Sequence, residues 1–295
     1  MMQSRQIALH RQSFHLLQAG SETAPALLFL HGFPEYSGAW TELVERLASD
    51  FFCLAPDQRG YGQSWAPAEI RAYALRHLVG DMAALLERLG RKATVVGHDW
   101  GASVAYGLAI ARPDLVSRLV IMNGVHPVPF QRALAAGGAQ SAASQYIHRL
   151  RRPGVETRLA EEDYALLLKT FSAQMDIRWL TADRLAGYRT AWARPGRLTG
   201  MLNWYRASPL VVADPGRPLR ADRLPALDPV ALRVRVPHLL IWGADDTALL
   251  PEATAGLEDL CEDVTRLDIP GTDHWLHHQA PDAVADAIAA FAARA

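Results

Sequence analysis

A strand that runs directly into a helix, through a turn centred on one acid, constrains this chain more than any other feature. The run 93–96, rich in β-branched residues, predicts the strand, and the apolar periodic segment 103–111 predicts the helix. The turn between them is Gly97-His98-Asp99-Trp100-Gly101-Ala102. Small neighbours let strand and helix approach closely while the central residue is strained, as a nucleophile elbow requires. The alternative interpretation makes Asp99 only a helix N-cap.

A carboxylate at the centre of this turn changes the chemistry that the turn can perform. Esterases carry a serine there. A carboxylate that attacks an acyl group forms a labile anhydride, whereas one that attacks a saturated carbon forms an ester that water can later open. Asp99 therefore predicts substitution at a saturated carbon.

Buried strands alternate with helices on either side of this turn. Apolar runs predict an edge strand at 13–17 and interior strands at 26–30, 51–55, 93–96, 118–122, 238–243 and 264–269. Helical periodicity predicts helices at 40–48, 73–89, 103–111, from about 252, and at 282–293. This alternation indicates an α/β fold with a mostly parallel, doubly wound sheet that is covered on both faces.

Residues 126–230 interrupt the alternation. Arg, Ala, Trp and Tyr at helical spacing replace the strands, and prolines punctuate the segment. We expect residues 1–125 and 231–295 to form the core domain and residues 126–230 to form an inserted helical cap domain. Such an insertion lies over the carboxyl ends of the strands, where open α/β sheets bind ligands.

Composition and charge argue against several classes of partner. The net charge of −1 and the lack of a basic cluster argue against nucleic acid and an anionic membrane surface. Cys53 and Cys261 lack the spacing of metal ligands, so we expect buried thiols, no disulfide, no metal and no cofactor. The chain shows no signal-like or membrane-spanning apolar run, which predicts a soluble, cytoplasmic protein. The oligomeric state stays open, with a homodimer as one option.

A carboxylate nucleophile needs a base and a group that orients the base. His274 follows the last predicted strand and Asp246 follows the strand before it, so both loops open at the same sheet edge as Asp99. The chain order of nucleophile, acid and histidine is that of an α/β-hydrolase triad, here Asp-His-Asp. His277 and His278 compete for the role of base, and we expect them to be solvated or supporting residues.

Two other positions compete with Asp246 for the role of the acid. Asp245 precedes it in the same loop. The loop after the strand that ends at Met122 is the other usual place, but it offers only Asn123, which cannot ionise.

Four motifs together resemble an epoxide hydrolase of the α/β-hydrolase fold, of the soluble type, over nearly the whole chain. They are His31-Gly32-Phe33-Pro34, the turn at 97–102, Asn203-Trp204-Tyr205-Arg206 and Gly271-Thr272-Asp273-His274-Trp275. In that family the acid lies five residues before a proline. This spacing matches Asp246 before Pro251 and favours it over Asp245.

The resemblance also implies roles for two tyrosines and two backbone amides. Tyr205 lies in the matched motif and Tyr146 lies early in the cap, so they correspond to the family's two cap tyrosines, with Tyr164 as the fallback for Tyr146. These phenols would protonate the opening ring. The N–H groups of Phe33 and Trp100 would form the oxyanion hole, and the 33–34 peptide bond is commonly cis in this motif.

The implied reaction converts an epoxide and water into a vicinal diol without a cofactor. Asp99 would form a covalent alkyl ester, and water activated by His274 and Asp246 would hydrolyse it. The substrate pocket is expected to include Phe33, Trp100 and Trp204. Three further cap aromatics, Trp179, Tyr188 and Trp192, suggest an apolar pocket that accepts aryl groups.

Three other functions compete with this one. A haloalkane dehalogenase shares the Asp-Trp pair, but that family usually carries Asn where this chain has Phe33. A haloacetate dehalogenase would carry Arg in place of Trp100. A ligand-binding protein on a hydrolase scaffold would be expected to have lost a triad member, and this chain retains all three.

Overall fold

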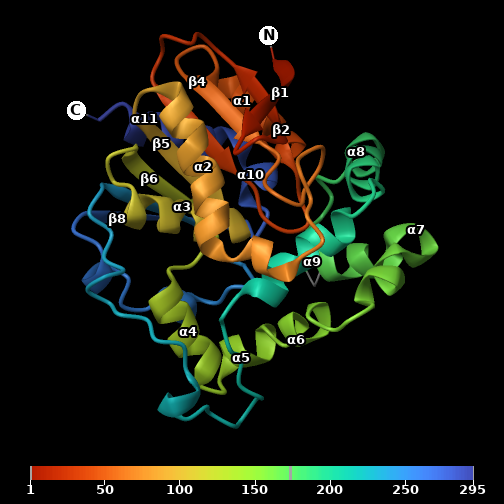
Figure 1. Ribbon diagram of the computed structural model, residues 1–295. Coiled ribbons are helices and arrows are strands. Elements are labelled where there is room, and N and C mark those ends of the chain that lie inside the picture. The colour runs from red at the N-terminus through yellow and green to blue at the C-terminus, as the bar shows by residue number, and fades with distance from the viewer. Residues whose placement is uncertain (1, 173–174, 295) are drawn as a thin grey trace.

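One eight-stranded sheet forms the centre of the molecule (Figure 1). The computed structural model describes residues 2–172 and 175–294. In spatial order the strands are β1 (Gln3–Leu9), β2 (Gln12–Ala19), β4 (Phe52–Pro56), β3 (Ala26–Leu30), β5 (Ala93–His98), β6 (Val116–Met122), β7 (His238–Gly243) and β8 (Val264–Ile269). Only the β1–β2 and β2–β4 pairs are antiparallel, and the remaining pairs are parallel. The mostly parallel α/β sheet is confirmed.

The amino-terminal edge of the sheet differs from the prediction. The strand predicted at 13–17 lies within β2, and β1 covers it on the outer side through an antiparallel ladder that pairs residues 3–9 with residues 12–18. Of the β1 side chains, only Ile7 and Leu9 are buried. The polar sequence of β1 carries little apolar alternation, so its pairing is decided by the neighbouring strand rather than by its own pattern.

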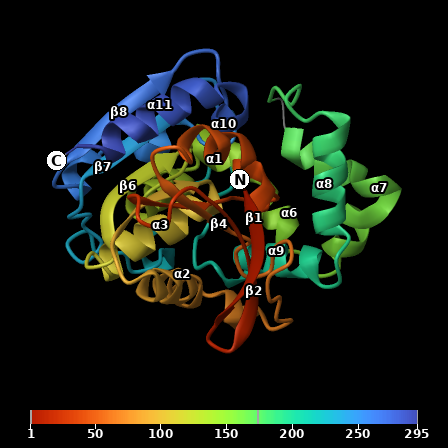
Figure 2. The same cartoon turned by 90° about the horizontal axis from the view of Figure 1, so that it is seen from above.

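Two layers of helices cover the faces of the sheet (Figure 2). The helices α1 (Thr41–Leu47) and α11 (Pro281–Ala292) share one core cluster with Leu27 and Phe29 of β3. The helices α2 (Leu75–Leu89) and α3 (Trp100–Ala111) share the other cluster with Leu28 and Leu30. Successive side chains of a strand point to opposite faces, so the uninterrupted apolar run of β3 supplies both layers.

The segment between β6 and β7 contains no named strand within the described residues. Its helices are α4 (Pro127–Ala135), α5 (Ala139–Ala143), α6 (Tyr146–Leu150), α7 (Val155–Ser172), α8 (Ala182–Trp192), α9 (Arg197–Ala207) and the 3₁₀ turn η3 (Ala221–Arg223). Residues 161–164 break α7 with non-helical backbone angles. We call residues 126–230 the helical insertion. Its helices gather beside the sheet (Figures 1 and 2). No helix in the described ranges is long and apolar enough to cross a membrane.

The helix predicted from about residue 252 is absent from this described part of the chain. Two 3₁₀ turns, η4 (Pro251–Thr254) and η5 (Glu258–Leu260), replace it. Gly256 lies between them with φ +78°, a left-handed conformation that ends helical propagation. Three further short elements complete the fold: η1 (Ser37–Trp40), η2 (Ile70–Tyr73) and α10 (Leu276–Gln279).

The two cysteines are free and buried, as predicted. Cys53 lies in the core between the sheet and α1, and Cys261 lies in the cluster on the opposite face. Burial raises the pKa of each thiol to about 12, so both side chains pack as small apolar groups.

Candidate active site

Asp99 lies at the turn between β5 and α3 with φ 49° and ψ −119°. A Cβ atom added to Gly32 would lie 2.4 Å from the Cβ of Asp99, and one added to Gly101 would lie 2.0 Å from the carbonyl oxygen of Leu30. Glycine at these positions therefore allows the close approach that the turn requires. Asp99 occupies the N-cap position of α3, but its carboxylate forms no capping hydrogen bond, so helix capping alone does not explain an acid at this position.

The two carboxylate oxygens of Asp99 have different surroundings. Oδ1 accepts a hydrogen bond of 2.8 Å from the backbone N–H of Phe33. Oδ2 lies 3.8 Å from Nε2 of His274, which is longer than a hydrogen bond. The peptide bond between Phe33 and Pro34 is cis, as the motif implies. The loop after β3 thus binds Oδ1, whereas Oδ2 faces His274 without a hydrogen bond to it.

His274 and Asp246 meet as the sequence predicts. They lie in the loops after β8 and β7, and Nδ1 of His274 is 2.8 Å from Oδ2 of Asp246. The other oxygen of Asp246 accepts from the backbone N–H groups of Ala248 and Leu249. Asp245, by contrast, is exposed. Because Asp246 accepts at Nδ1, this ring nitrogen carries the proton and Nε2 faces Asp99.

Asn123 supports the acid, although it cannot replace it. Its side-chain amide donates to Oδ2 of Asp246 at 2.6 Å, and its carbonyl accepts from the N–H of Gly243 at 2.6 Å. The end of β6 is thereby joined to the loop after β7. Sequence reasoning rejected Asn123 because it lacks a charge, yet its position after a strand was the signal that could have found it.

The charges of the triad favour a protonated histidine in the free protein. Burial opposes the charge on His274, but Asp246 and then Asp99 outweigh it and raise the pKa of His274 to about 9. Burial likewise opposes the charge on Asp246, and His274 still holds the pKa of that carboxyl below its usual value. The pair is therefore an ionised, hydrogen-bonded unit at neutral pH.

Tyr146 of α6 and Tyr205 of α9 meet above Asp99. Their rings lie 6.2 Å apart in an edge-to-face arrangement, and the ring of Tyr205 also packs against Phe33 and Trp100. Burial raises the pKa of both phenols, so each keeps its proton at neutral pH. Tyr164, the fallback, instead packs against Trp192 and lies outside the cavity lining.

A cavity of about 730 Å³ connects these groups. Its lining includes Phe33, Asp99, Tyr146, Tyr205, His274 and Trp275. Trp100 lines a smaller adjoining cavity together with Asp99 and both tyrosines. Trp204 is not a pocket residue, which corrects the sequence prediction: it is buried, and its indole N–H donates to the carbonyl of Arg59 at 2.9 Å.

The other cap aromatics also lie outside the cavity lining. The indole of Trp192 donates to the carbonyl of Pro34 at 2.7 Å, and the phenol of Tyr188 donates to Glu35 at 2.8 Å. Trp179 stacks on His278, with ring centroids 3.7 Å apart. These side chains attach the helical insertion to the core, so they do not support the expectation of an aryl-accepting pocket.

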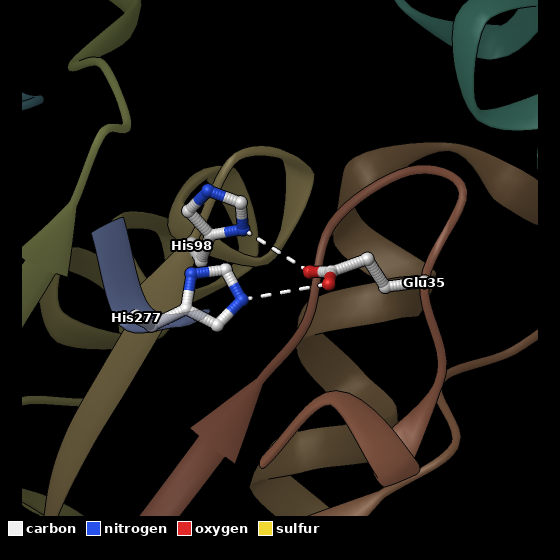
Figure 3. Close-up of side chains that lie close together, drawn as sticks. All are labelled: Glu35, His98 and His277. Carbon is white, nitrogen blue, oxygen red and sulfur yellow. Dashed lines mark hydrogen bonds and ion pairs between the residues drawn. The ribbon is translucent and has the colours of Figure 1, made fainter. Parts of the chain in front are cut away.

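A buried carboxylate with three histidines lies behind the triad, and Figure 3 shows this carboxylate, Glu35, with two of them, His98 and His277. Glu35 Oε2 is 3.3 Å from Nδ1 of His98, and Oε1 is 2.9 Å from Nε2 of His278 and 3.4 Å from Nε2 of His277. We call Glu35, His98, His277 and His278 the Glu35 cluster. His277 and His278 are buried, which excludes the solvated alternative and leaves the supporting one. No sequence pattern pointed to Glu35 beyond its place next to Pro34.

The Glu35 cluster is linked to the base through the main chain. His98 contacts the carbonyl oxygen of His274 through Nε2 at 2.8 Å, while its other nitrogen faces Glu35. Although burial opposes its charge, Glu35 has a pKa held well below its usual range by the surrounding histidines, His277 first. Burial lowers the pKa of His277 and of His278.

Among the described residues, three members of the Glu35 cluster form a group whose side chains could bind a metal ion. Ligand atoms of Glu35, His98 and His277 lie within 4.8 Å of one another (Figure 3). Glu35, however, already accepts a hydrogen bond from Tyr188 and contacts His278 at hydrogen-bond distance. A buried carboxylate satisfied by such partners explains the cluster without a metal.

Comparisons with known proteins agree with this geometry. A family model described as the alpha/beta hydrolase fold matches residues 25–281. The chain is 32% identical to AB hydrolase superfamily protein YfhM of Bacillus subtilis, over 91% of this chain and 90% of that protein. It is 30% identical to epoxide hydrolase 4 of Mus musculus, over 94% and 76% of the respective chains. A solved structure described among novel epoxide hydrolases in metagenomes from hot environments is similar with a TM-score of 0.91 and 35% identity, covering 100% of both chains.

Proposed function

Because this chain belongs to the α/β-hydrolase fold family and is an epoxide hydrolase, we propose that it opens epoxides through a covalent ester on Asp99. The observation that carries the proposal is the unequal environment of the two Asp99 oxygens. Oδ1 is held by the N–H of Phe33, and Oδ2 faces the cavity side of His274 without a hydrogen bond to it. An oxygen without such a bond keeps its lone pairs for attack on carbon.

In the first half-reaction, Oδ2 of Asp99 attacks one ring carbon of the epoxide. The carbon–oxygen bond of the ring breaks, and its electron pair goes to the ring oxygen. A phenol proton from Tyr146 or Tyr205 neutralises the developing alkoxide, which is general acid catalysis worth about 10²- to 10⁴-fold. The products are a hydroxyalkyl ester of Asp99 and a tyrosinate.

In the second half-reaction, water adds to the carbonyl carbon of the ester. Because the ester removes the charge of Asp99, His274 releases to solvent the Nε2 proton that it carries in the free protein, and it regains that proton when Asp99 recovers its charge. The neutral ring then takes a proton from this water at Nε2 while Asp246 holds Nδ1–H. The negative charge then develops on Oδ1, which already lies 2.8 Å from the N–H of Phe33. The N–H of Trp100 is the second donor that we propose, and one such donor contributes about 3 kcal/mol to the transition state.

Collapse of this intermediate breaks the bond between the Asp99 carbonyl carbon and the ester oxygen, the former Oδ2, which leaves with the product. The imidazolium of His274 protonates that oxygen, and the vicinal diol leaves. The proton that Asp99 releases on regaining its charge restores the tyrosine. One epoxide and one water thus give one diol, and every group returns to its starting state.

The helical insertion acts in this scheme as the cap domain. Its contribution to the cavity includes Tyr146 and Tyr205, while the core supplies the triad. The pair of phenols favours epoxide opening over dehalogenation. A departing ring oxygen needs a proton, whereas a departing halide needs only hydrogen-bond donors.

The test is to trap the ester. Removing the base leaves attack by Asp99 intact but stops the activation of water, so His274→Gln should gain the mass of one substrate when mixed with excess epoxide. Intact-protein mass spectrometry measures the gain, and peptide mapping should place it on Asp99. The matched control is the double variant His274→Gln with Asp99→Ala, which should gain nothing.

Labelled water supplies an independent criterion. During a single turnover in ¹⁸O-water, the label should enter the Asp99 carboxyl before it enters the diol, because the attacked carbon belongs to the protein. A first-turnover diol that carries the label, or a His274→Gln protein without adduct, would show that water attacks the epoxide directly.

A further inference from the structure

We propose that this enzyme prefers epoxides that carry an anionic group, and that Arg149 and Lys169 bind that group at the cavity wall. The inference rests on the proposed function and names a substrate class for it. It begins from the charges in the cavity wall. Besides the catalytic Asp99 and His274, the only charged residues that line the cavity are Arg149 and Lys169, among the residues that the structure describes.

These two cations have no acidic partner among the described residues, unlike several other basic residues of the helical insertion. Arg189 pairs with Asp163 at 2.8 Å, and Arg206 pairs with Glu156 at 2.6 Å. Arg178 and Arg184 are paired as well. Within the described residues, no carboxylate lies within ion-pair distance of Arg149 or Lys169, although both line the cavity. Their charge is therefore available to a ligand.

Helix geometry directs both cations into the same space as the phenols. Arg149 follows Tyr146 by three residues on α6, and side chains three apart lie on one helix face. Lys169 lies on α7, three residues after Leu166 and directly before Thr170. All three residues line the cavity. A step of three residues along a helix is about 4.5 Å. Arg149 therefore lies about one helical turn along α6 from Tyr146, and Lys169 reaches the same cavity from α7.

The rest of the cavity wall is mostly apolar. It includes Pro34, Ala143, Leu166 and Ala248. An epoxide at Asp99 that bears a short alkyl chain would fill this apolar stretch and bring a terminal anion to the two cations. A neutral terminus would leave both charges unpaired, and an anion directly beside the ring would be repelled by Asp99.

The expected preference is modest because Arg149 and Lys169 are exposed to solvent. Exposed ion pairs each change affinity by a factor of about 2 to 5. Two of them predict about a tenfold advantage in kcat/KM for an anionic substrate over its neutral analogue at low salt. Screening over a Debye length of about 10 Å at 0.1 M salt should reduce the advantage as salt is added.

The experiment compares ω-epoxy carboxylates of graded chain length with their methyl esters and with ω-epoxyalkyl phosphates. The readout is the ratio of kcat/KM for anion to that for ester, measured by diol formation. We expect a ratio of about 10 that peaks at one chain length and falls with salt. A steeper salt dependence for the phosphate than for the carboxylate is expected from its greater charge.

Matched variants assign the effect to the two cations. The ratio should fall severalfold in Arg149→Met and in Lys169→Met, and it should approach 1 in the double variant. The controls are Lys92→Met, which removes the only other lysine of the chain, and Arg158→Met on the first part of α7. Both residues are exposed and lie outside the cavity lining, so the ratio should keep its wild-type value.

Two outcomes overturn the inference. One is an anion-to-ester ratio near 1 in the wild type at every chain length, and the other is a ratio that survives in the double variant. Failure of the proposed function has a different signature, since in that case the methyl esters give no diol either and His274→Gln forms no adduct with them.

Discussion

The triad and the Glu35 cluster are built from the same chemical groups, carboxylates and imidazoles, yet the pKa of His274 is shifted in the opposite direction to those of His277 and His278. His274, His277 and His278 are all buried. The pKa of His274 is raised to about 9, whereas the pKa values of His277 and His278 are lowered. Burial alone therefore does not decide the charge of a histidine in this protein.

The ratio of carboxylates to imidazoles accounts for the difference. In the triad, two carboxylates, Asp246 and Asp99, face one imidazole. In the Glu35 cluster, one carboxylate faces three imidazoles, and each added positive charge would repel the others. The same burial thus yields a charged base beside the cavity, and behind it two histidines, His277 and His278, that resist protonation.

The largest effect is expected when Asp246, the acid of the triad, loses its charge. Asp246→Asn should lower kcat by about 1,000-fold, because His274 loses both its orienting acceptor and its charge partner. Steady-state diol formation measures the loss. The neighbouring Asp245→Asn removes an exposed carboxylate from the same loop and should leave kcat within about twofold of the wild type. Equal losses in both variants would refute the role of Asp246.

Removing the carboxylate of the Glu35 cluster should affect folding more than chemistry. Glu35→Gln removes the carboxylate that Tyr188, His98 and His278 share as a hydrogen-bond partner and leaves buried polar groups unsatisfied, so the free energy of unfolding at pH 7 should fall by about 3 kcal/mol in urea titrations. Exposed Glu45→Gln on α1 is the control, with an expected change within about 0.5 kcal/mol. An unchanged unfolding free energy in Glu35→Gln would contradict this reading of the cluster.

The smallest effect concerns how the two regions respond to pH. His274 has a pKa raised above its unfolded value of about 6.5, so its contribution to stability is complete below pH 6.5 and is lost as the pH rises through about 9. His277 and His278 have lowered pKa values, so the unfolded state binds their protons more readily than the folded state does. The free energy of unfolding should therefore decrease as the pH falls below about 6.5.

Asp99→Ala sharpens this contrast because it removes one of the two carboxylates that face His274. The midpoint of the His274 titration, followed by NMR, should fall from about 9 by about one pH unit. Asp99 loses the same charge when it becomes an ester, so the base should be easier to deprotonate during hydrolysis. A midpoint that stays at 9 in Asp99→Ala would mean that Asp246 alone sets the pKa.

Local pattern was sufficient to predict most of the sheet and the order of the triad. The strands at 26–30, 93–96 and 238–243 are continuous apolar runs, and such runs are characteristic of strands that are buried on both faces. Asp99, Asp246 and His274 each follow a strand, and parallel strands bring their carboxyl ends to one edge. Proximity of these residues therefore follows from chain order alone.

Pattern was insufficient where pairing or a single residue overrides periodicity. β1 is polar and exists because β2 offers it a ladder partner. The segment after Pro251 has apolar residues but is divided by Gly256, so it forms two 3₁₀ turns instead of a helix. Neither outcome can be decided from the spacing of apolar residues.

The partners of individual side chains were decided by the tertiary structure. The sequence shows that Trp179, Tyr188 and Trp192 lie in the helical insertion, but only its packing on the core directs them to His278, Glu35 and Pro34 rather than to the cavity. Helical periodicity specifies which face of a helix is apolar and carries no information on what covers that face. The triad was predictable because chain order brings its members together, whereas the Glu35 cluster depends on how distant segments pack.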